Sequence, residues 1–241
     1  MKYREFDFLR MCPAEREALA AEIDALAEQV RSVWKYEFIK RYTPRGVRSC
    51  RVCTIYDETG ALVGYQFVAA IDVTVAGRDC TVIRSCVTKC RQRAPSKSAF
   101  DGFGARTTLH LALKAKLRGR ETWVVGGALA PVTYHVMAKH FDVMIPSARG
   151  DDHPVPMDFF LELREAAGFG PATSNPFLGK GEIQLDVTDE ERASWAAREE
   201  PAVRRYLETC PEYGNGQMLV FAVPIVLRNV LSLLARFVGL R

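Results

Sequence analysis

The chain has 241 residues, of which 48% are hydrophobic, 26% charged and 10% aromatic. This composition supports a buried core in one large domain, or in one domain with an appended segment, and excludes disordered, collagen-like and disulfide-stapled classes. The formal charge of +4 falls well short of a nucleic-acid-binding composition, so we expect no nucleic-acid partner. Seven cysteines and an N-terminus without an apolar run predict a reducing, cytoplasmic compartment.

The first part of the chain predicts one helix followed by three antiparallel strands. Apolar residues recur every three or four positions from residue 13 to about residue 42, which indicates a helix. After a Pro-Arg-Gly break, stretches typical of strands occupy residues 51–56, 62–75 and 80–88. The turn sequences DETG and AGRD separate these strands, as in consecutive hairpins.

The middle of the chain alternates between helices and strands. A basic loop at 89–98 leads into the glycine pair Gly102 and Gly104, and an amphipathic helix is expected from about 105 to 118. A short apolar strand at 121–126 follows, and then a helix at 130–141 with an early proline. Exposed N–H groups at the start of a helix favour a bound anion, and glycines allow its close approach.

The region that follows is less regular. We expect a loop at 146–156, a helix at 157–167 and a short strand at 183–187. Thr188 with Glu191 three residues later forms a capping box, which predicts the start of one helix over 188–210.

Residues 217–241 are the most apolar segment and contain three arginines but no acidic residue. After Pro224, helical spacing places Arg228, Asn229, Ser232, Arg236 and Gly239 within about 100° of arc, opposite a wide apolar face. A span needs roughly 20 uninterrupted apolar residues, so this pattern favours a helix in the membrane interface at 225–241. The alternative is a helix that packs on the protein's own core or at a dimer contact.

The order of elements over residues 51–146 resembles that of the GNAT superfamily of N-acyltransferases. The strands around DETGALVG are similar to the family's second and third strands, and CTVIRSCVT to its fourth. The basic loop with GFGARTTLHLALKAK is similar to the acyl-donor pyrophosphate site and its helix. APVTYHVMAKHF resembles the helix on which many members place a tyrosine.

This resemblance implies an α/β (α+β) fold with a mixed central sheet flanked by helices, a C-terminal helical extension and an amphipathic tail helix. We expect a GNAT-like core with N-terminal helices at 1–146, a lid or acceptor extension at 147–216, and an apolar strand plus tail helix at 217–241. The family's loop has Gln or Arg three residues before a glycine, where this chain has Ala99 or Asp101. The departure admits an acyl-carrier protein as donor beside acyl-coenzyme A.

The candidate donor-binding residues are basic or small. Arginine side chains supply charge-assisted donors to a diphosphate or to a phosphopantetheine group. The candidate residues, in the basic loop and at the start of the helix after it, are Arg91, Arg93, Gly102, Gly104 and Arg106. Lys97 is a further cation in the loop.

Acyl transfer to an amine needs a base for the amine proton and an acid for the leaving thiolate. The resemblance makes Tyr134 the candidate acid, although a packed tyrosine is the alternative. His135 and His110 are candidate bases because histidine titrates near neutral pH. Asp72 lies within an apolar strand and is either catalytic or paired with Arg84 across the sheet.

The cysteines do not predict a metal site. Cys50 and Cys53 form a single C-x-x-C pair, whereas zinc ribbons use two. Three-residue spacing on a strand directs side chains to opposite faces. We therefore expect Cys80, Cys86 and Cys90 to fill small apolar spaces.

Three functions remain open from the sequence. The first is an N-acyltransferase that moves a fatty acyl group to an amine, such as an amino acid, a polyamine or a peptide side chain, at the inner membrane face. The second is a non-catalytic module that binds lipid or a partner at the membrane surface. The third is a regulator that binds a phosphorylated ligand near residues 91–106.

Overall fold

The computed structural model describes residues 1–29, 46–89, 97–150, 154–170, 174–185 and 187–231. The chain divides into two compact units. Unit 1 comprises Met1–Val73 and Thr81–Arg120, and unit 2 comprises Thr74–Cys80 and Glu121–Arg241. Strands flanked by helices make up both units, which confirms the predicted α/β class.

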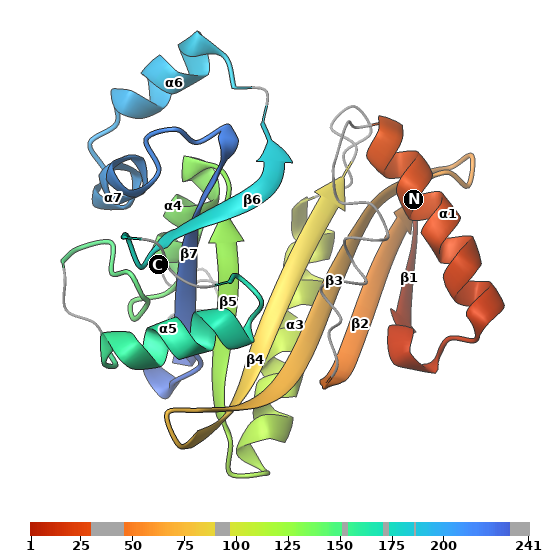
Figure 1. The fold of residues 1–241 in the computed structure, drawn as a ribbon. Coiled ribbons are helices and arrows are strands. Elements are labelled where there is room, and N and C mark those ends of the chain that lie inside the picture. The colour runs from red at the N-terminus through yellow and green to blue at the C-terminus, as the bar shows by residue number, and fades with distance from the viewer. Residues whose placement is uncertain (30–45, 90–96, 151–153, 171–173, 186, 232–241) are drawn as a thin grey trace. The chain divides into compact units, whose positions relative to one another are not determined.

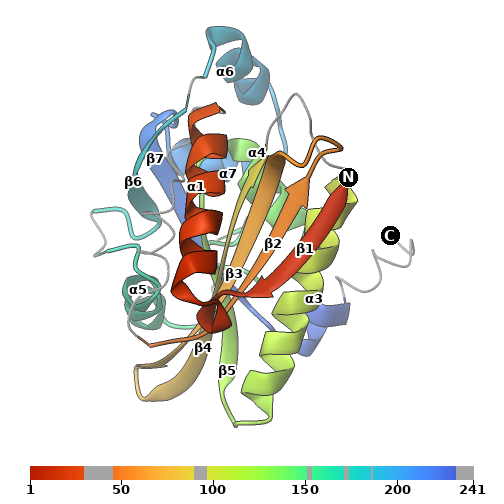
Figure 2. The same cartoon turned by 90° about the vertical axis from the view of Figure 1, so that its right-hand side faces the viewer.

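Unit 1 contains four neighbouring strands in chain order: β1 (Lys2–Asp7), β2 (Val47–Tyr56), β3 (Leu62–Val75) and β4 (Arg78–Lys89). The β1–β2 and β2–β3 pairs are antiparallel. Helices α1 (Pro13–Gln29) and α3 (Lys97–Lys116) lie on opposite faces of these strands, and the short 3-10 helix η1 (Phe8–Arg10) follows β1 (Figures 1 and 2).

These bounds confirm the three predicted strands and the first turns of the predicted N-terminal helix. The rest of that helix prediction lies outside the described residues. Strand β1 was missed, because its mostly exposed residues carry no apolar alternation.

The centre of unit 1 is built on β3. Its first ten residues are all buried, as expected for a strand that is covered on both faces. The turn before β3 is the predicted one: the Asp57 carboxylate accepts hydrogen bonds from the backbone N–H groups of Thr59 and Ala61. Gly60 has a φ of +84°, which glycine adopts without strain.

Helix α3 begins at Lys97, about eight residues earlier than predicted. Gly102 and Gly104 therefore lie inside the helix and not in a loop before it. The reason is packing: buried residues recur every four positions at Phe103, Thr107, Leu111 and Ala115. This apolar stripe offsets the cost of a helical glycine, which is about 1 kcal/mol.

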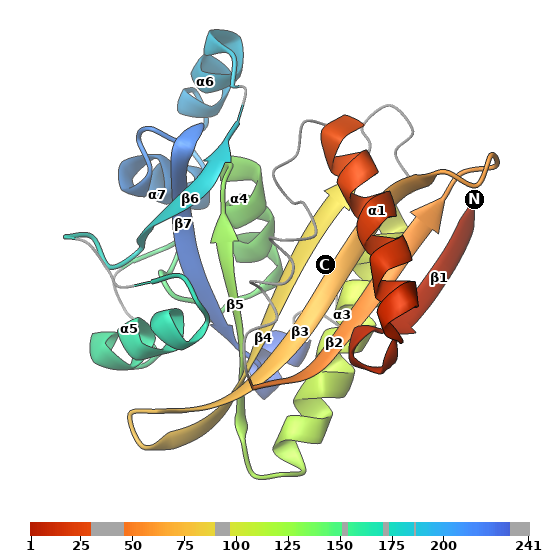
Figure 3. The same cartoon turned by 45° about the vertical axis from the view of Figure 1, so that its right-hand side comes forward.

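Unit 2 contains three antiparallel strands in the order β5 (Glu121–Ala128), β7 (Asn215–Pro224) and β6 (Leu178–Gln184). Figure 3 shows them side by side. The helices of the unit are α4 (Pro131–His140), α5 (Met157–Ala166), α6 (Asp189–Ala196) and α7 (Pro201–Thr209). Helices α4 and α5 and strands β5 and β7 occur where the sequence places them, whereas β6 begins earlier than its prediction.

The single helix predicted over 188–210 is wrong, because the segment forms α6 and α7 with a break between them. Proline lacks an N–H and clashes inside a helix, and Pro201 opens α7 instead. The predicted cap is confirmed: the Glu191 N–H donates to Thr188 Oγ1 at 3.1 Å.

The tail after β7 is only partly described. Residues 227–231 are helical, and the remainder of the predicted interface helix, 232–241, lies outside the described residues. Within the part of the chain that the structure describes, no helix is long and apolar enough to cross a membrane.

Candidate functional site

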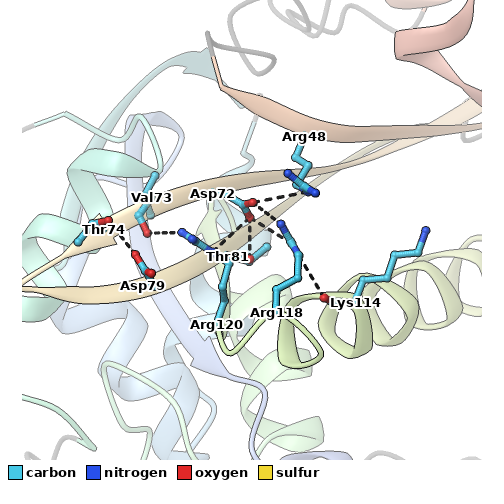
Figure 4. A network of polar contacts seen from close by, with 9 residues as sticks. All are labelled: Arg48, Asp72, Val73, Thr74, Asp79, Thr81, Lys114, Arg118 and Arg120. Carbon is cyan, nitrogen blue, oxygen red and sulfur yellow. Dashed lines mark hydrogen bonds and ion pairs between the residues drawn. The ribbon is translucent and has the colours of Figure 1, made fainter.

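In unit 1, Asp72 lies near the end of β3 at the centre of a charged network (Figure 4). Arg118 Nη1 donates to Asp72 Oδ2 at 2.5 Å, and Thr81 Oγ1 donates to Oδ1 at 2.7 Å. The Nε atoms of Arg48 and Arg120 each lie 3.6 Å from the same carboxylate. The structure thus gathers residues from β2, β3, β4 and the turn after α3 around one acid.

This environment argues against Asp72 as a general base. Burial alone would raise its pKa, but hydrogen bonds from Arg118 and Thr81 and the nearby charges outweigh burial and lower the pKa. A carboxylate with a lowered pKa accepts a proton poorly at neutral pH.

The predicted salt bridge between Asp72 and Arg84 is also not formed. Arg84 lies three positions after Thr81 on β4, so the two side chains point to opposite faces, and Thr81 is the residue that contacts Asp72. Arg84 is buried and has interactions of its own. The alternation of side chains on a strand therefore rules out the pair.

Arg106 lies on the exposed side of α3. Its Nη2 donates to Glu5 Oε1 on β1, and the other oxygen of Glu5 lies 4.0 Å from Arg51 Nη2. The Arg106 side chain keeps about two thirds of its surface exposed, and His110, one turn further along, is also exposed. An anion can therefore reach this arginine from solvent.

The two glycines of α3 have different surroundings. A Cβ at Gly104 would lie 2.7 Å from Nε2 of the buried Gln66 side chain, which donates to Ser85 Oγ. A Cβ at Gly102 would meet no atom within 4 Å. Gly104 therefore allows α3 to pack on β3.

Because α3 begins at Lys97, the turn that could bind an anion lies before Gly102 and Gly104. Free N–H groups of a helix lie in its first turn, which here begins at Lys97. The N–H groups of Gly102 and Gly104, in the helix interior, donate within the helix instead. Arg91 and Arg93 precede this turn and lie outside the described residues.

In unit 2, Tyr134 on α4 is fully buried. Its hydroxyl donates to the carbonyl oxygen of Pro146 at 2.8 Å, and burial raises its pKa well above the ordinary value. These observations favour the packed alternative, because the proton is held by a buried backbone acceptor. His135 is half-buried and forms no hydrogen bond or ion pair with the described residues.

Sequence reasoning missed the role of Asn229. Its Nδ2 donates to the carbonyl oxygens of Val143 and Pro224, each at 2.8 Å, and its Oδ1 accepts from the Val143 N–H at 3.0 Å. The side chain is fully buried, whereas Leu227 and Leu231 are exposed. Asn229 was expected on the same polar arc as Arg228, yet Asn229 is buried while Arg228 is exposed. An asparagine within the apolar run VLRNVL is the only sequence signal for this contact.

The cysteines that the structure describes fit the packing interpretation. Cys50, Cys53, Cys80 and Cys210 are buried and form no disulfide, whereas Cys12 is exposed. Burial together with the Glu5 charge raises the pKa of Cys53 to about 11. Among the described residues, no group of three His, Cys, Asp or Glu side chains is placed to hold a metal ion. Cys90 and the side chain of Cys86 lie outside the description.

Comparisons with known proteins reveal structural similarity without sequence similarity. No family model matches the chain, and no curated protein matches its sequence. Solved structures similar to it include a putative phosphinothricin N-acetyltransferase, with 10% identity over 93% of this chain and 99% of that chain and a TM-score of 0.38.

Two further solved structures are also similar. One is a GNAT superfamily phosphinothricin acetyltransferase from Sinorhizobium meliloti in complex with AcCoA, with 14% identity, 93% and 89% coverage and a TM-score of 0.35. The other is a conserved protein from Enterococcus faecalis V583 described as a probable N-acyltransferase, with 9% identity, 58% and 33% coverage and a TM-score of 0.34. Because these TM-scores lie below 0.5, no residue role is transferred from these structures.

The candidate residues thus separate into local groups. Arg106 lies ten residues before Lys116, the last residue of α3, which corresponds to about 15 Å along the helix axis. The Asp72 network lies at that far end, so within unit 1 it is distinct from the Arg106 region. Tyr134 and His135 belong to unit 2.

Proposed function

We propose that the chain is an N-acyltransferase that transfers an acyl group from acyl-coenzyme A to an amine. The observation that carries this proposal is the order β2, β3, β4, α3, β5 and α4, with an arginine-bearing segment immediately before α3. The resemblance to the GNAT superfamily rests on the same order. Coenzyme A is preferred to an acyl-carrier protein as the donor, because basic residues and free helix N–H groups bind a pyrophosphate directly.

In the proposed reaction, the amine nitrogen attacks the thioester carbon, the carbon–sulfur bond breaks, and the amine loses a proton. The first turn of α3, together with Arg91, Arg93 and Arg106, binds the donor's phosphates. With Asp72 held by arginines, His135 and His110 are the remaining candidates for the base that accepts the amine proton. Tyr134 positions α4 through its bond to Pro146, and the departing thiolate takes its proton from solvent or from the base.

We further propose that the donor carries a fatty acyl chain. In this proposal the protein acts at the cytoplasmic face of a membrane, which residues 225–241 contact. The described start of this tail supports it: Leu227 is 73% exposed and Leu231 is 55% exposed, and Val226 is exposed beside them. The three arginines and the absence of acidic residues from 217 onward suit an anionic lipid surface.

Release of free coenzyme A thiol from acetyl-, octanoyl- and palmitoyl-coenzyme A, with an amino acid, a polyamine or a peptide as acceptor, tests the reaction. We expect turnover with at least one pair and, for Arg106→Gln, donor binding weakened about tenfold, as for the loss of one charge-assisted contact. Arg51→Gln is the matched control, since Arg51 also faces Glu5 but lies on β2. If the wild-type chain neither binds nor turns over any donor, the acyl-coenzyme A proposal fails.

Cosedimentation with vesicles that contain an anionic phospholipid tests the tail. The double variant Leu227→Asp with Leu231→Asp retains the buried Asn229 contacts and should lose vesicle binding. Val132→Asp is the control, because Val132 is also an exposed apolar residue of unit 2. Equal binding by both variants and the wild type would contradict membrane contact through the tail.

The second candidate is a non-catalytic module that binds lipid or a partner, and the buried, bonded state of Tyr134 favours it. It predicts vesicle or ligand binding with no thiol release from any donor. Turnover with any donor and acceptor pair would exclude it.

A further inference from the structure

The Asp72 network holds more positive charge than its carboxylate requires. Arg118 alone contacts both Asp72 oxygens, through Nη1 at 2.5 Å and Nη2 at 3.4 Å. Arg120 has a structural role as well, because its Nη2 donates to the carbonyl oxygen of Val73 at 2.8 Å. These contacts leave the third arginine, Arg48, without an evident structural task.

Arg48 extends from β2 toward the same carboxylate, but only its Nε comes within 3.6 Å, and its side chain is 59% exposed. It forms no hydrogen bond with the described residues, and an exposed ion pair at this distance contributes little to stability. Arg118 beside it is 31% exposed. Two guanidinium groups therefore converge at the solvent-facing edge of Asp72 (Figure 4).

The balance of charge at this edge is positive. Three guanidinium groups surround one carboxylate in unit 1. The Lys114 side chain points away from Asp72, and only its carbonyl oxygen takes part, as the acceptor from Arg118 Nε. Clustered guanidinium groups with exposed N–H edges match the geometry and charge of a phosphate group.

We propose that Arg48 and Arg118 bind a phosphate group at the exposed edge of Asp72, whose carboxylate competes with the phosphate for their guanidinium groups. The ligand class is inorganic phosphate or a phosphomonoester, either free in solution or as a lipid headgroup. The C-terminal end of α3 repels anions, so the attraction comes from the arginines. The site lies beyond the C-terminal end of α3, about 15 Å along the helix axis from Arg106 in its middle, and is independent of the proposed acyl-donor site.

Titration calorimetry with inorganic phosphate at constant ionic strength tests the site. The background is the triple variant Arg91→Gln, Arg93→Gln and Arg106→Gln, so that the other candidate arginine contacts to phosphate are absent. We expect Arg48→Gln to weaken binding about tenfold, as for one lost charge-assisted contact. Arg10→Gln is the matched control: it makes the same charge change on an 87% exposed arginine of unit 1 and should alter affinity by less than about twofold.

Asp72→Asn gives a prediction of opposite sign. It removes the anion that competes for the guanidinium groups, so phosphate should bind more tightly than in the parent, as long as circular dichroism shows the variant folded at the temperature used. Vesicles with phosphatidic acid, a phosphomonoester, distinguish the source. Vesicle binding that depends on Arg48 indicates a lipid headgroup as the ligand. Binding of inorganic phosphate without vesicle binding indicates a soluble ligand. The proposal is overturned if the parent binds no phosphate, or if Arg48→Gln and Arg10→Gln have equal effects.

Discussion

Asp72 in unit 1 and Asn229 in unit 2 both interrupt apolar sequence, yet the fold satisfies them in different ways. The Asp72 side chain keeps a fifth of its surface exposed and is held by other charged side chains. Asn229 is fully buried and is held by backbone atoms of Val143 and Pro224. A charge is costly to remove from water, whereas a neutral amide is tolerated inside when backbone groups meet its hydrogen bonds.

This contrast determines how much each contact stabilises the chain. Loss of a fully buried partner leaves backbone groups unpaired with no water to replace it. At a partly exposed site, water and the remaining charges compensate. We therefore expect larger effects in the core of unit 2 than at the edge of unit 1.

The largest expected effect is that of Asn229→Ala, which leaves the Val143 N–H and two carbonyl oxygens without their partner. We expect the free energy of unfolding to fall by about 3 kcal/mol, measured by urea denaturation. The adjacent variant Arg228→Ala is the control and should cost less than about 1 kcal/mol, because Arg228 is exposed and its only described ion pair is long, at 3.8 Å. Similar losses in both variants would show that the buried bonds of Asn229 are not decisive.

Asp72→Asn should cost less, about 1–2 kcal/mol at pH 7. The pKa of Asp72 is lowered in the folded state, so its ionised form stabilises the chain above the ordinary aspartate pKa. That contribution disappears as the pH falls through the lowered pKa. The difference between wild type and variant should therefore be full at pH 6–7 and shrink below about pH 4. Urea denaturation at pH 7 and pH 3 measures it, and a deficit that does not change with pH would contradict the ionic explanation.

Tyr134→Phe tests the packed tyrosine against the catalytic acid. We expect a loss of about 1 kcal/mol in unfolding free energy, because the Pro146 carbonyl oxygen loses its donor. Turnover should stay within about twofold of wild type once a donor and acceptor pair is known. A fall in kcat of about a hundredfold or more, with the protein still folded, would instead restore Tyr134 as the acid.

The smallest expected changes in stability are those of alanine substitutions at the two glycines of α3. Gly102→Ala should stabilise the helix by about 0.5–1 kcal/mol, since a new Cβ meets no neighbouring atom. Gly104→Ala should gain less or lose stability, because its Cβ displaces the buried Gln66 amide. Thermal melting of both variants provides the comparison. Equal gains would show that Gln66 moves aside without cost.

Much of the fold could be predicted from local chemistry. The hairpin at DETG, the strand bounds of β3 and the proline-opened α4 depend on turn residues, alternation and capping, which act over a few positions. Pro201 also marks the break between α6 and α7 in the sequence, although the helix predicted from the capping box at Thr188 ran past it. The start of α3 depends on tertiary packing, because burial of Phe103 and Thr107 outweighs the cost of the two helical glycines.

For the candidate site, the sequence by itself identified Asp72 as a charged group within an apolar strand, because composition and periodicity are properties of a short stretch. Tyr134 became a candidate only through the resemblance. Only the tertiary structure decided what each one does. The partners of Asp72 include Arg118, 46 positions away, and Asn229 bonds to Val143, 86 positions away. Hydrogen bonds and ion pairs act over a few ångströms, so the role of a polar side chain depends on which distant residues the fold brings within that range.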